Sequence, residues 1–289
     1  MDRHVWKSMC HATRSADRRV RRQGRTPTFS DQLILKMLLW SIAHDRPLCW
    51  ASDRRHYNGL FRPKQLPSNS QFCRRVKTTR INQMLQAAHE YLVGRDPAAE
   101  RLFFDGKALP IGDFSRDPDA RDGFGSGKLQ RGYKLHALGT LDERILDFRV
   151  LPLNAGEPDT ARQLAPRIPP QALVLADANY DSSLLYQAVR DRGSVLVTPL
   201  KGRARSVGQL RRMSAARRSA IELWDTHPDI CQHVQAWRDQ IERIFSALCG
   251  FGGGLSPLPA WVRRMDRVRR WVTGKVILYN ARLYCRRAS

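Results

Sequence analysis

The segment ALVLAD, residues 172–177, is the strongest indicator of the fold class. Its five apolar residues predict a short buried strand that ends in an acid. Asp181 or Ser182 can then cap a helix with apolar side chains at helical spacing, and Gly193 ends that helix. A second apolar run follows at residues 194–197. A strand, a helix and a second strand in this order predict two parallel strands joined by a crossover helix.

Upstream of this unit, the sequence predicts further strands. Residues 102–104 are an apolar run that ends in Asp105. Residues 133–137 and 146–150 alternate between apolar and polar side chains, as half-buried strands do, and residues 140–143 have the composition of the turn between them. A hairpin followed by a strand–helix–strand unit predicts an α/β fold with a mixed sheet flanked by helices.

A helical region is expected before the sheet. Ser30 can cap a first helix, and Pro47 interrupts the chain after it. Ser68 or Ser70 can cap a second helix that carries Phe72, Val76 and Ile81 on its apolar side. Arg74 and Arg75 lie on the polar side of that helix, so a small DNA-binding domain is expected. The alternative is an ordinary helical subdomain with a basic solvent face.

Both ends of the chain are strongly basic. Lys and Arg number 50 and Asp and Glu number 27, which gives a net charge of +23. Residues 1–100 carry +11, residues 101–200 are neutral and residues 201–289 carry +12. Such segregation predicts a polyanionic partner, with nucleic acid favoured over a membrane. Residues 1–28 are predicted to be an Arg-rich arm, which is either ordered on a partner or a solvated tail.

Other features exclude several classes of protein. No apolar run is long enough to span a bilayer, and the first residues lack the apolar core of a signal peptide. The six cysteines are scattered, which disfavours a disulfide framework or a zinc ribbon. A cytoplasmic protein is therefore expected.

Two helices are expected in the C-terminal third of the chain. A long helix is predicted over about residues 229–248, because apolar side chains recur every three or four residues. That apolar stripe consists of Ile230, Val234, Trp237, Ile241, Phe245 and Leu248. Residues 250–254, GFGGG, are expected to end the helix. A last basic helix is expected to carry Arg263, Arg267 and Arg270 on one face.

Three acids are candidates for chemistry. Asp105 and Asp177 each follow a short apolar strand, and ligands bind near strand ends in open α/β sheets. Carboxylates suit Mg²⁺, although Asp also ends strands simply as a turn former. Glu242 lies on the predicted long helix, four residues after Arg238. The alternative for Glu242 is an ordinary surface ion pair with Arg238.

Several segments resemble the DDE transposases of bacterial insertion sequences. They are LFFDGKALP, GYKLHALGTLDERILDFRVLPLNAGEPDT, LVLADANYDSSLLYQAV and WRDQIERIFSAL, and they cover about residues 100–250. The stretch FSDQLILKMLLWSIAHDRPLCWAS, with LPSNSQFCRRV, resembles the helical N-terminal region of the same proteins. The resemblance implies an RNase H-like catalytic domain over residues 99–289, ending in the basic helix. A helical domain at residues 29–98 and the arm at 1–28 would precede it.

The resemblance also implies a site and a reaction. Asp105, Asp177 and Glu242 match the metal-binding acids, which would hold two Mg²⁺ (or Mn²⁺) ions. These ions would activate water and then a 3′-OH for DNA cleavage and strand transfer. Arg238 matches an arginine that holds a phosphate. The chain departs from the fuller motif at Gln235, where Tyr is usual, and at Cys249, where Lys is usual; the basic continuation is replaced by residues 250–254.

The expected partner is double-stranded DNA, both at the terminal inverted repeats of an element and at a target site. The protein is expected to form a homodimer on DNA in the bacterial nucleoid. No association with a membrane is expected. The candidate DNA contacts are Arg238, Lys134, His136, Arg74, Arg75, Arg263, Arg267 and Arg270. Two alternatives remain open. One is another RNase H-like nuclease, which cuts without joining. The other is a catalytically impaired DNA-binding remnant or repressor, which the departures from the motif favour.

Overall fold

The computed structural model describes residues 1–22, 24–94, 100–112, 114–125, 127–201, 213–250 and 255–288. They fall into two compact units. The helical unit comprises Met1–Gly94 and Leu248–Ser289, and the sheet unit comprises Arg95–Ala247. The C-terminal helix is therefore part of the helical unit. The predicted boundary at residues 99–289 had placed this helix in the sheet domain instead.

Helix α11 (Met265–Ala288) is the reason for this division. Val268, Val272 and Val276 are fully buried, and Ile277 and Ala281 are buried on other sides of the helix. A helix that is buried on nearly all sides must be surrounded by other elements. Helices α1 (Arg3–Arg19), α2 (Asp31–Ala43) and α4 (Thr79–Val93) pack against it. The predicted basic helix covers only the first two turns of α11.

The predicted N-terminal arm is helix α1, packed into the same core. Val5, Trp6, Met9 and Ala16 are buried, and Asp2 caps the helix by accepting from two backbone N–H groups. The Trp6 ring lies 5.1 Å from that of Trp40 on α2. The prediction of an arm was wrong because it rested on the arginine cluster at residues 18–25 and overlooked the apolar stripe at helical spacing that precedes it.

Capping side chains set the boundaries of the other helices as the sequence indicates. Ser30 accepts from the backbone N–H of Leu33 at the start of α2. Ser68, rather than Ser70, caps α3 (Asn69–Arg75) in a capping box with Gln71. Thr78 then caps α4, so two helices replace the single one expected here. Two 3₁₀ helices, η1 (Leu48–Ser52) and η2 (Arg54–His56), lie between α2 and α3.

The sheet unit contains a six-stranded mixed sheet. Its strands are β1 (Arg101–Pro110), β2 (Arg121–Gly125), β3 (Lys128–Thr140), β4 (Ile145–Pro152), β5 (Leu173–Leu175) and β6 (Val195–Val197). The order is β2-β3-β1-β5-β6, with β4 also paired to β3. Strands β1, β5 and β6 are parallel, whereas β3 is antiparallel to β1, β2 and β4. The hairpin, the crossover and the mixed α/β sheet predicted from the sequence are confirmed.

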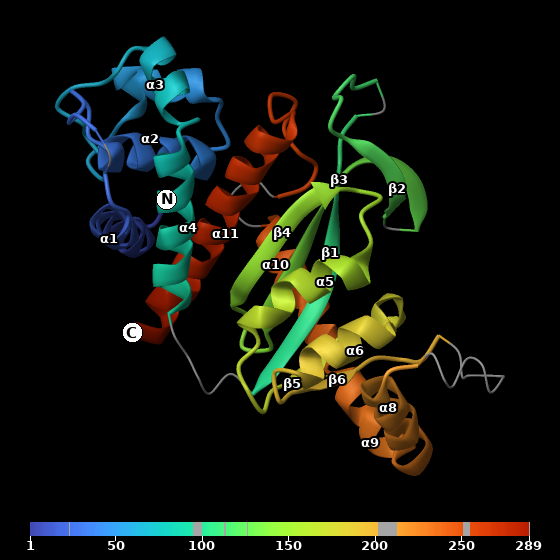
Figure 1. Ribbon diagram of the computed structural model, residues 1–289. Helices are drawn as coiled ribbons and strands as arrows, with labels where there is room; N and C mark the ends of the chain where they lie inside the picture. The colour runs from blue at the N-terminus through green and yellow to red at the C-terminus, as the bar shows by residue number, and fades with distance from the viewer. Residues whose placement is uncertain are drawn as a thin grey trace. The chain divides into compact units, whose positions relative to one another are not determined.

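Helices cover both faces of this sheet (Figure 1). On one face, α5 (Glu157–Leu164) and α6 (Ser183–Arg190) pack on Leu102, Phe104 and Leu138. On the other face, α10 (Arg238–Gly250) packs through Phe245, whose ring lies 6.2 Å from that of Phe103. The alternation of side chains along β1 thus assigns even-numbered residues to the α5 face and odd-numbered residues to the α10 face.

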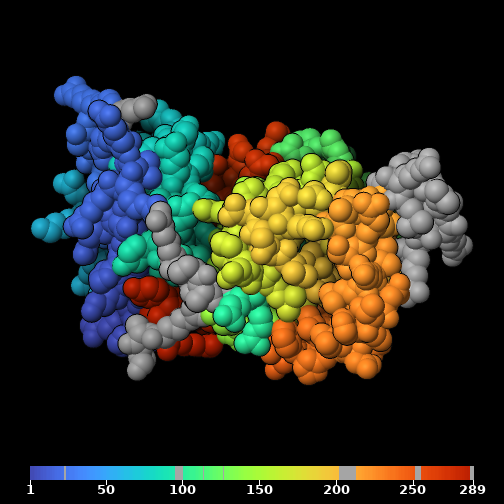
Figure 2. Space-filling view, turned by 60° about the horizontal axis from the view of Figure 1, so that its bottom comes forward, coloured from blue at the N-terminus to red at the C-terminus, as the bar shows by residue number. Residues whose placement is uncertain are grey.

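The smaller elements complete the sheet unit. They are η3 (Ala165–Arg167), η4 (Ala178–Tyr180), α8 (Ala215–Thr226) and α9 (Pro228–Ala236). The space-filling view shows the yellow surface of α6 next to the orange surface of α8 and α9 (Figure 2). In the described residues, no helix is long and apolar enough to cross a membrane.

The long helix predicted at residues 229–248 is two helices, α9 and α10, that meet at Trp237. Ile230, which the predicted stripe placed in the core, is 59% exposed. Trp237 instead lies under the Arg101 guanidinium, 5.2 Å from it. Helix α10 ends at Gly250, and the rest of the predicted Gly-rich terminator, residues 251–254, lies outside the described residues.

Candidate active site

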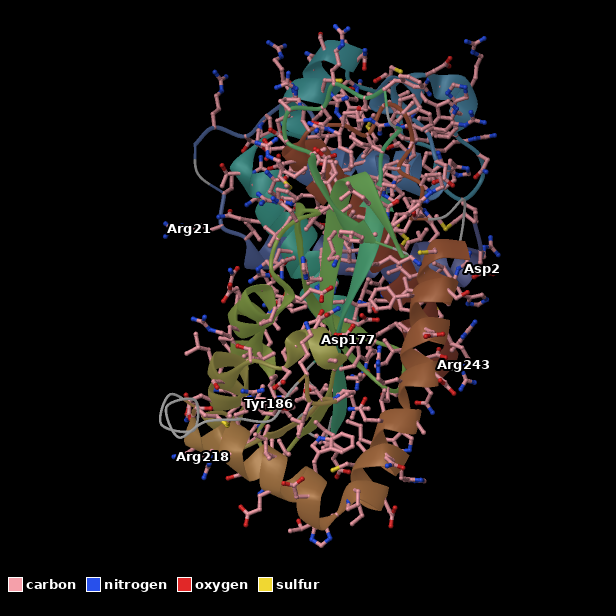
Figure 3. The ribbon with its side chains drawn as sticks, turned by 90° about the vertical axis from the view of Figure 1, so that its right-hand side faces the viewer. Asp2, Arg21, Asp177, Tyr186, Arg218 and Arg243 are labelled. Atoms are coloured by element: carbon pink, nitrogen blue, oxygen red, sulfur yellow. The ribbon has the colours of Figure 1, made fainter. Side chains whose placement is uncertain are left out.

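Strand pairing places Asp105 and Asp177 side by side. The parallel pairing of β1 with β5 ends at Phe103 and Leu175, and each Asp lies two residues farther along its strand direction. A two-residue step keeps both carboxylates on the α10 face of the sheet. Asp177 lies next to β1 in the stick view (Figure 3). The sequence analysis expected Asp105 to end its strand. In the structure, β1 continues past Asp105 and pairs with β3 as far as Pro110.

The two carboxylates influence each other electrostatically. Burial, together with the negative charge of Asp177, raises the pKa of Asp105 to about 6. The Gly106 backbone N–H, which donates to Asp105 Oδ1 at 2.7 Å, and the charge of Arg238 act in the opposite direction. Asp177 accepts from the Asn179 N–H at 2.7 Å and so caps η4. These contacts fix both side chains at a site of concentrated negative charge.

Helix α10 brings Arg238 to these acids but leaves Glu242 on an exposed surface. Arg238 is the first residue of α10, and its charge acts on Asp105. Glu242 lies one turn later and is exposed. Within the described parts of the chain, no three Asp, Glu, His or Cys side chains are placed to hold a metal ion together. The structure therefore brings Asp105, Asp177 and Arg238 together, and does not bring Glu242 into a ligand set with them.

Glu157 is a neighbour of the site that the sequence analysis missed. It is the first residue of α5, and its Oε1 accepts from Lys134 Nζ at 2.6 Å. Both side chains are largely buried, at 15% and 12% exposed. The negative charge of Glu157 contributes to the raised pKa of Asp105. The signal available in the sequence was an acid in the first turn of a helix, within the segment NAGEPDT.

Gly106 makes the close packing of this ion pair possible. A Cβ atom at this position would lie 3.1 Å from Lys134 Cδ and 3.3 Å from Glu157 Oε1. A larger residue after Asp105 would therefore require the ion pair, which covers this position on the α5 face, to shift by a few tenths of an ångström. The pair consequently lies on the opposite face of β1 from the Asp105 side chain.

Tyr180 is a buried polar group close to the same acids. It is 1% exposed, and its ring stacks on Phe104 at 6.1 Å. Its hydroxyl has no hydrogen-bond partner in the described structure. Burial raises the pKa of Tyr180 well above its ordinary value, and the charges of Glu157 and Asp105 act in the same direction. Tyr180 is therefore a neutral hydrogen-bond donor within the electrostatic reach of the site.

The structure does not support two of the predicted DNA contacts. His136 is 2% exposed, and burial and the charge of Lys134 lower its pKa to about 4. A neutral imidazole inside the unit is not available to a phosphate. Lys134 is bound to Glu157, so its charge is already neutralised. Both residues lie on the face of β3 that α5 covers, rather than on the solvated strand face that a DNA contact would need.

The other predicted contacts have different environments. Arg75 binds the buried carboxylate of Asp31, so it has a structural role. Arg74 is exposed on α3. Arg263 and Arg267 donate to the backbone carbonyls of Pro259 and Trp261, each at 2.8 Å. Burial lowers the pKa of Arg270. None of these five arginines lies in the sheet unit.

One departure from the resembled motif has a structural explanation. Gln235 donates through Nε2 to the carbonyl of Val197 at 2.8 Å and so ties α9 to β6. The side chain at this position therefore contributes to packing in the sheet unit. Cys249 lies near the end of α10 and is half-buried, and its thiol forms no disulfide.

Comparison with known proteins agrees with this architecture. Residues 96–281 match a family model described as the transposase DDE domain. The solved structure of a piggyBac transposase synaptic complex with hairpin DNA is similar, with a TM-score of 0.51 and 9% identity. The match covers 98% of this chain and 72% of that one, and at this identity it bears on the fold alone. No curated protein matches the chain. The family match spans well over half of the sequence, and the chain belongs to the transposase DDE domain family.

Proposed function

We propose that the chain is the transposase of a bacterial insertion sequence, which binds the element ends and catalyses metal-dependent DNA cleavage and strand transfer. The family match supports transposition in general. The observation that carries the proposal is the register of β1 and β5, which aligns Asp105 with Asp177. Two adjacent carboxylates, one with a pKa raised by burial and by the charge of the other, are costly unless a cation neutralises them.

The donor set fits Mg²⁺ or Mn²⁺. The oxygens of Asp105 and Asp177 are the hard ligands that these ions prefer. Bound ions would activate an attacking oxygen and stabilise the leaving oxygen of an in-line displacement. Arg238, close to Asp105, would hold a phosphate of the DNA by a charge-assisted hydrogen bond.

Glu242 is the proposed third carboxylate. It lies on the same side of α10 as Arg238, because residues four apart are neighbours on a helix surface. Arg238 already reaches the electrostatic environment of Asp105. In this proposal Glu242 joins Asp105 and Asp177 as a metal ligand when DNA binds. Glu157 is bound to Lys134 and therefore remains a neighbour of the site in this proposal.

The architecture supports an RNase H-like assignment for the sheet unit. The order β4-β3-β1-β5-β6, with three antiparallel strands followed by a parallel pair, suits that fold. In this proposal the basic helical unit binds double-stranded DNA, through Arg74 and exposed arginines of α11. The same proposal includes a homodimer on paired ends and a cytoplasmic, nucleoid-associated protein.

Two other functions remain distinct from this one. An RNase H-like nuclease would cut DNA in the presence of the metal but would not join ends. A remnant or repressor would bind DNA without cutting it. Gln235 no longer favours the remnant on structural grounds, because it has a packing role.

Plasmid cleavage tests the proposal. Purified full-length protein is incubated with supercoiled plasmid that carries the DNA flanking its coding sequence, with Mg²⁺, Mn²⁺ or EDTA. We expect metal-dependent nicking at the ends, followed by strand joining. Asp177→Asn should abolish nicking, because it removes one ligand charge without changing side-chain size. Arg243→Gln is the matched control, since Arg243 is exposed on α10 (Figure 3).

The variants also separate the alternatives. Nicking without joining would favour a nuclease, and DNA binding without nicking in either metal would favour a remnant. Glu242→Gln should lower nicking by about a hundredfold or more if it supplies a ligand. Nicking by Glu242→Gln at the wild-type rate would exclude it from the site.

A further inference from the structure

We infer that a cavity in the helical unit binds an unpaired nucleotide of DNA. The cavity has a volume of about 250 Å³ and lies between the apolar side of α2 and the start of α11. All of its lining residues belong to the helical unit. This inference rests on the proposed DNA-binding function but concerns a different unit from the one that holds Asp105 and Asp177.

The charges that line the cavity are all positive. Arg46, Lys77, Arg267 and Arg270 contribute to its wall, and no lining residue is Asp or Glu. Burial lowers the pKa of Arg270, and the carboxylate of Asp266, which lines an adjacent depression, partly opposes that effect. Four cations around one opening are complementary to a phosphate group, which accepts charge-assisted hydrogen bonds from guanidinium and ammonium groups.

Two indole rings supply the other half of a nucleotide site. Trp261 is 38% exposed, and Arg267 donates to its backbone carbonyl at 2.8 Å, which restrains this segment. Trp271 is 4% exposed, and its Nε1–H has no acceptor in the described structure. Leu38 and Ile42 of α2 add apolar surface. A nucleobase suits this lining, because its faces stack on indole rings and its edge offers acceptors to a buried N–H.

The size of the cavity selects the form of DNA. A volume of about 250 Å³ is far too small for a duplex and equals that of roughly eight water molecules. A single base therefore enters only when it is unpaired, as at a strand end or where a nucleotide is turned out of the duplex. The net charge of +23 favours a nucleotide that is part of DNA over a free one, because flanking phosphates add to the attraction.

Fluorescence of an unpaired base tests the inference. The probe is a duplex with a three-nucleotide 3′ overhang that contains 2-aminopurine, compared with a blunt duplex that contains it at the end, both with EDTA and full-length protein. We expect binding to quench the overhang probe and to be about tenfold tighter than for the blunt duplex, as stacking of one base on an aromatic ring predicts.

Variants assign this preference to the cavity. Trp261→Ala and Arg46→Gln should remove most of the preference for the overhang, whereas Trp261→Phe should keep it. Arg14→Gln is the matched charge control, because Arg14 is exposed on α1 and does not line the cavity. It should weaken binding of both probes equally. Circular dichroism and thermal unfolding confirm that each variant is folded.

Three results would overturn the inference. They are equal affinity for both duplexes, a preference that Trp261→Ala leaves intact, and binding of free dAMP as tight as that of the overhang. Equal affinity for both duplexes, together with metal-dependent nicking of plasmid, would leave the proposed function standing. Absence of both DNA binding and nicking would instead remove the proposed function on which the inference rests.

Discussion

At the scale of single residues, the site combines groups that stability alone would not select. Asp105 is buried beside Asp177, and Tyr180 keeps a hydroxyl without a partner in the described structure. Each feature costs free energy in the unligated protein, since buried charges and donors lose their hydration. Strain of this kind concentrates at functional sites.

Replacement of Asp105 by Asn is expected to stabilise the metal-free protein. The folded-state pKa of about 6 lies above the ordinary value of 3.8, so the folded chain binds the proton more tightly. Stability due to this group therefore falls as pH rises from about 4 to 6, and the full cost persists at pH 8. Asp105→Asn should raise the free energy of unfolding at pH 8 in EDTA by about 3 kcal/mol and abolish nicking. Equal or lower stability of the variant in thermal unfolding would contradict this reading.

His136 is expected to make the protein sensitive to mild acid. Its folded-state pKa of about 4 lies below the ordinary value of 6.5, so the unfolded chain takes up the proton first as pH falls. Its contribution to stability is therefore complete above pH 6.5 and is lost progressively between 6.5 and 4. Denaturant unfolding of wild type should lose about 2 kcal/mol more between pH 7 and 5 than that of His136→Leu. Identical pH profiles would show that His136 does not titrate as proposed.

At the scale of secondary-structure elements, ion pairs fix the helices that carry the predicted DNA contacts. Asp31, at the start of α2, is 5% exposed and binds Arg22, Arg75 and Arg80. Arg80 also binds Asp17 of α1 at 2.6 Å. Burial alone would raise the pKa of Asp31, but the hydrogen bonds from Arg75 and Arg80 outweigh it and lower the pKa. The arginines on this side of α3 and α4 thus join helices within the unit.

Removal of this carboxylate is expected to loosen the helical unit. Asp31→Asn leaves three guanidinium groups without their shared anion and should cost about 3 kcal/mol in the free energy of unfolding. The estimate is at the lower end for a buried pair, because the arginine side chains are 16–24% exposed. Asp53→Asn is the control, since Asp53 pairs with the exposed Arg55 and its replacement should cost far less stability. Urea unfolding with similar midpoints for both variants would exclude the structural role.

At the scale of the whole molecule, charge and core are organised by unit. The helical unit depends on a helix that follows the sheet unit in the chain, because α11 supplies its central apolar residues. Both strongly basic segments of the sequence, residues 1–100 and 201–289, contribute to this unit. A high positive charge in one unit suits non-specific attraction to DNA.

Removal of α11 is expected to unfold the helical unit. A chain that ends at Gly250 lacks Val268, Val272 and Val276, which are fully buried. Amide hydrogen exchange in α2 and α4 should become fast, while strands β1 and β3 keep their protection. A chain that lacks only residues 287–289 serves as the control. Retained protection of α2 and α4 without α11 would contradict the role assigned to that helix.

Binding of DNA is expected to depend steeply on salt. If about eight phosphates are neutralised, the logarithm of the association constant should fall with the logarithm of salt concentration at a slope near −7. Arg74→Gln should reduce the slope by about one unit, because Arg74 is exposed. Arg75→Gln should instead lower stability, since Arg75 binds Asp31. A slope near zero for wild type would exclude a mainly electrostatic interface.

The local structure and the candidate acids could be predicted from short segments of the chain. Ser30, the hairpin turn at residues 140–143 and the apolar runs before Asp105 and Asp177 act over a few residues, so their effects can be predicted locally. The order of the predicted strands and helix indicated the mixed sheet, and the resemblance of several segments to DDE transposases indicated the family. Two predictions were wrong. The arm at residues 1–28 contains helix α1, whose apolar stripe was overlooked beside the arginine cluster. The single helix at residues 229–248 is broken at Trp237, although the apolar stripe continues past that residue.

Contacts between distant residues depend on the folded chain as a whole. It aligned Asp105 with Asp177, paired Lys134 with Glu157, buried His136 under α5 and returned α11 to the first helices of the chain. These outcomes depend on strand register and on which faces of the elements pack together. Register and packing are settled by the total burial of apolar surface, a property of the whole chain that no short segment encodes.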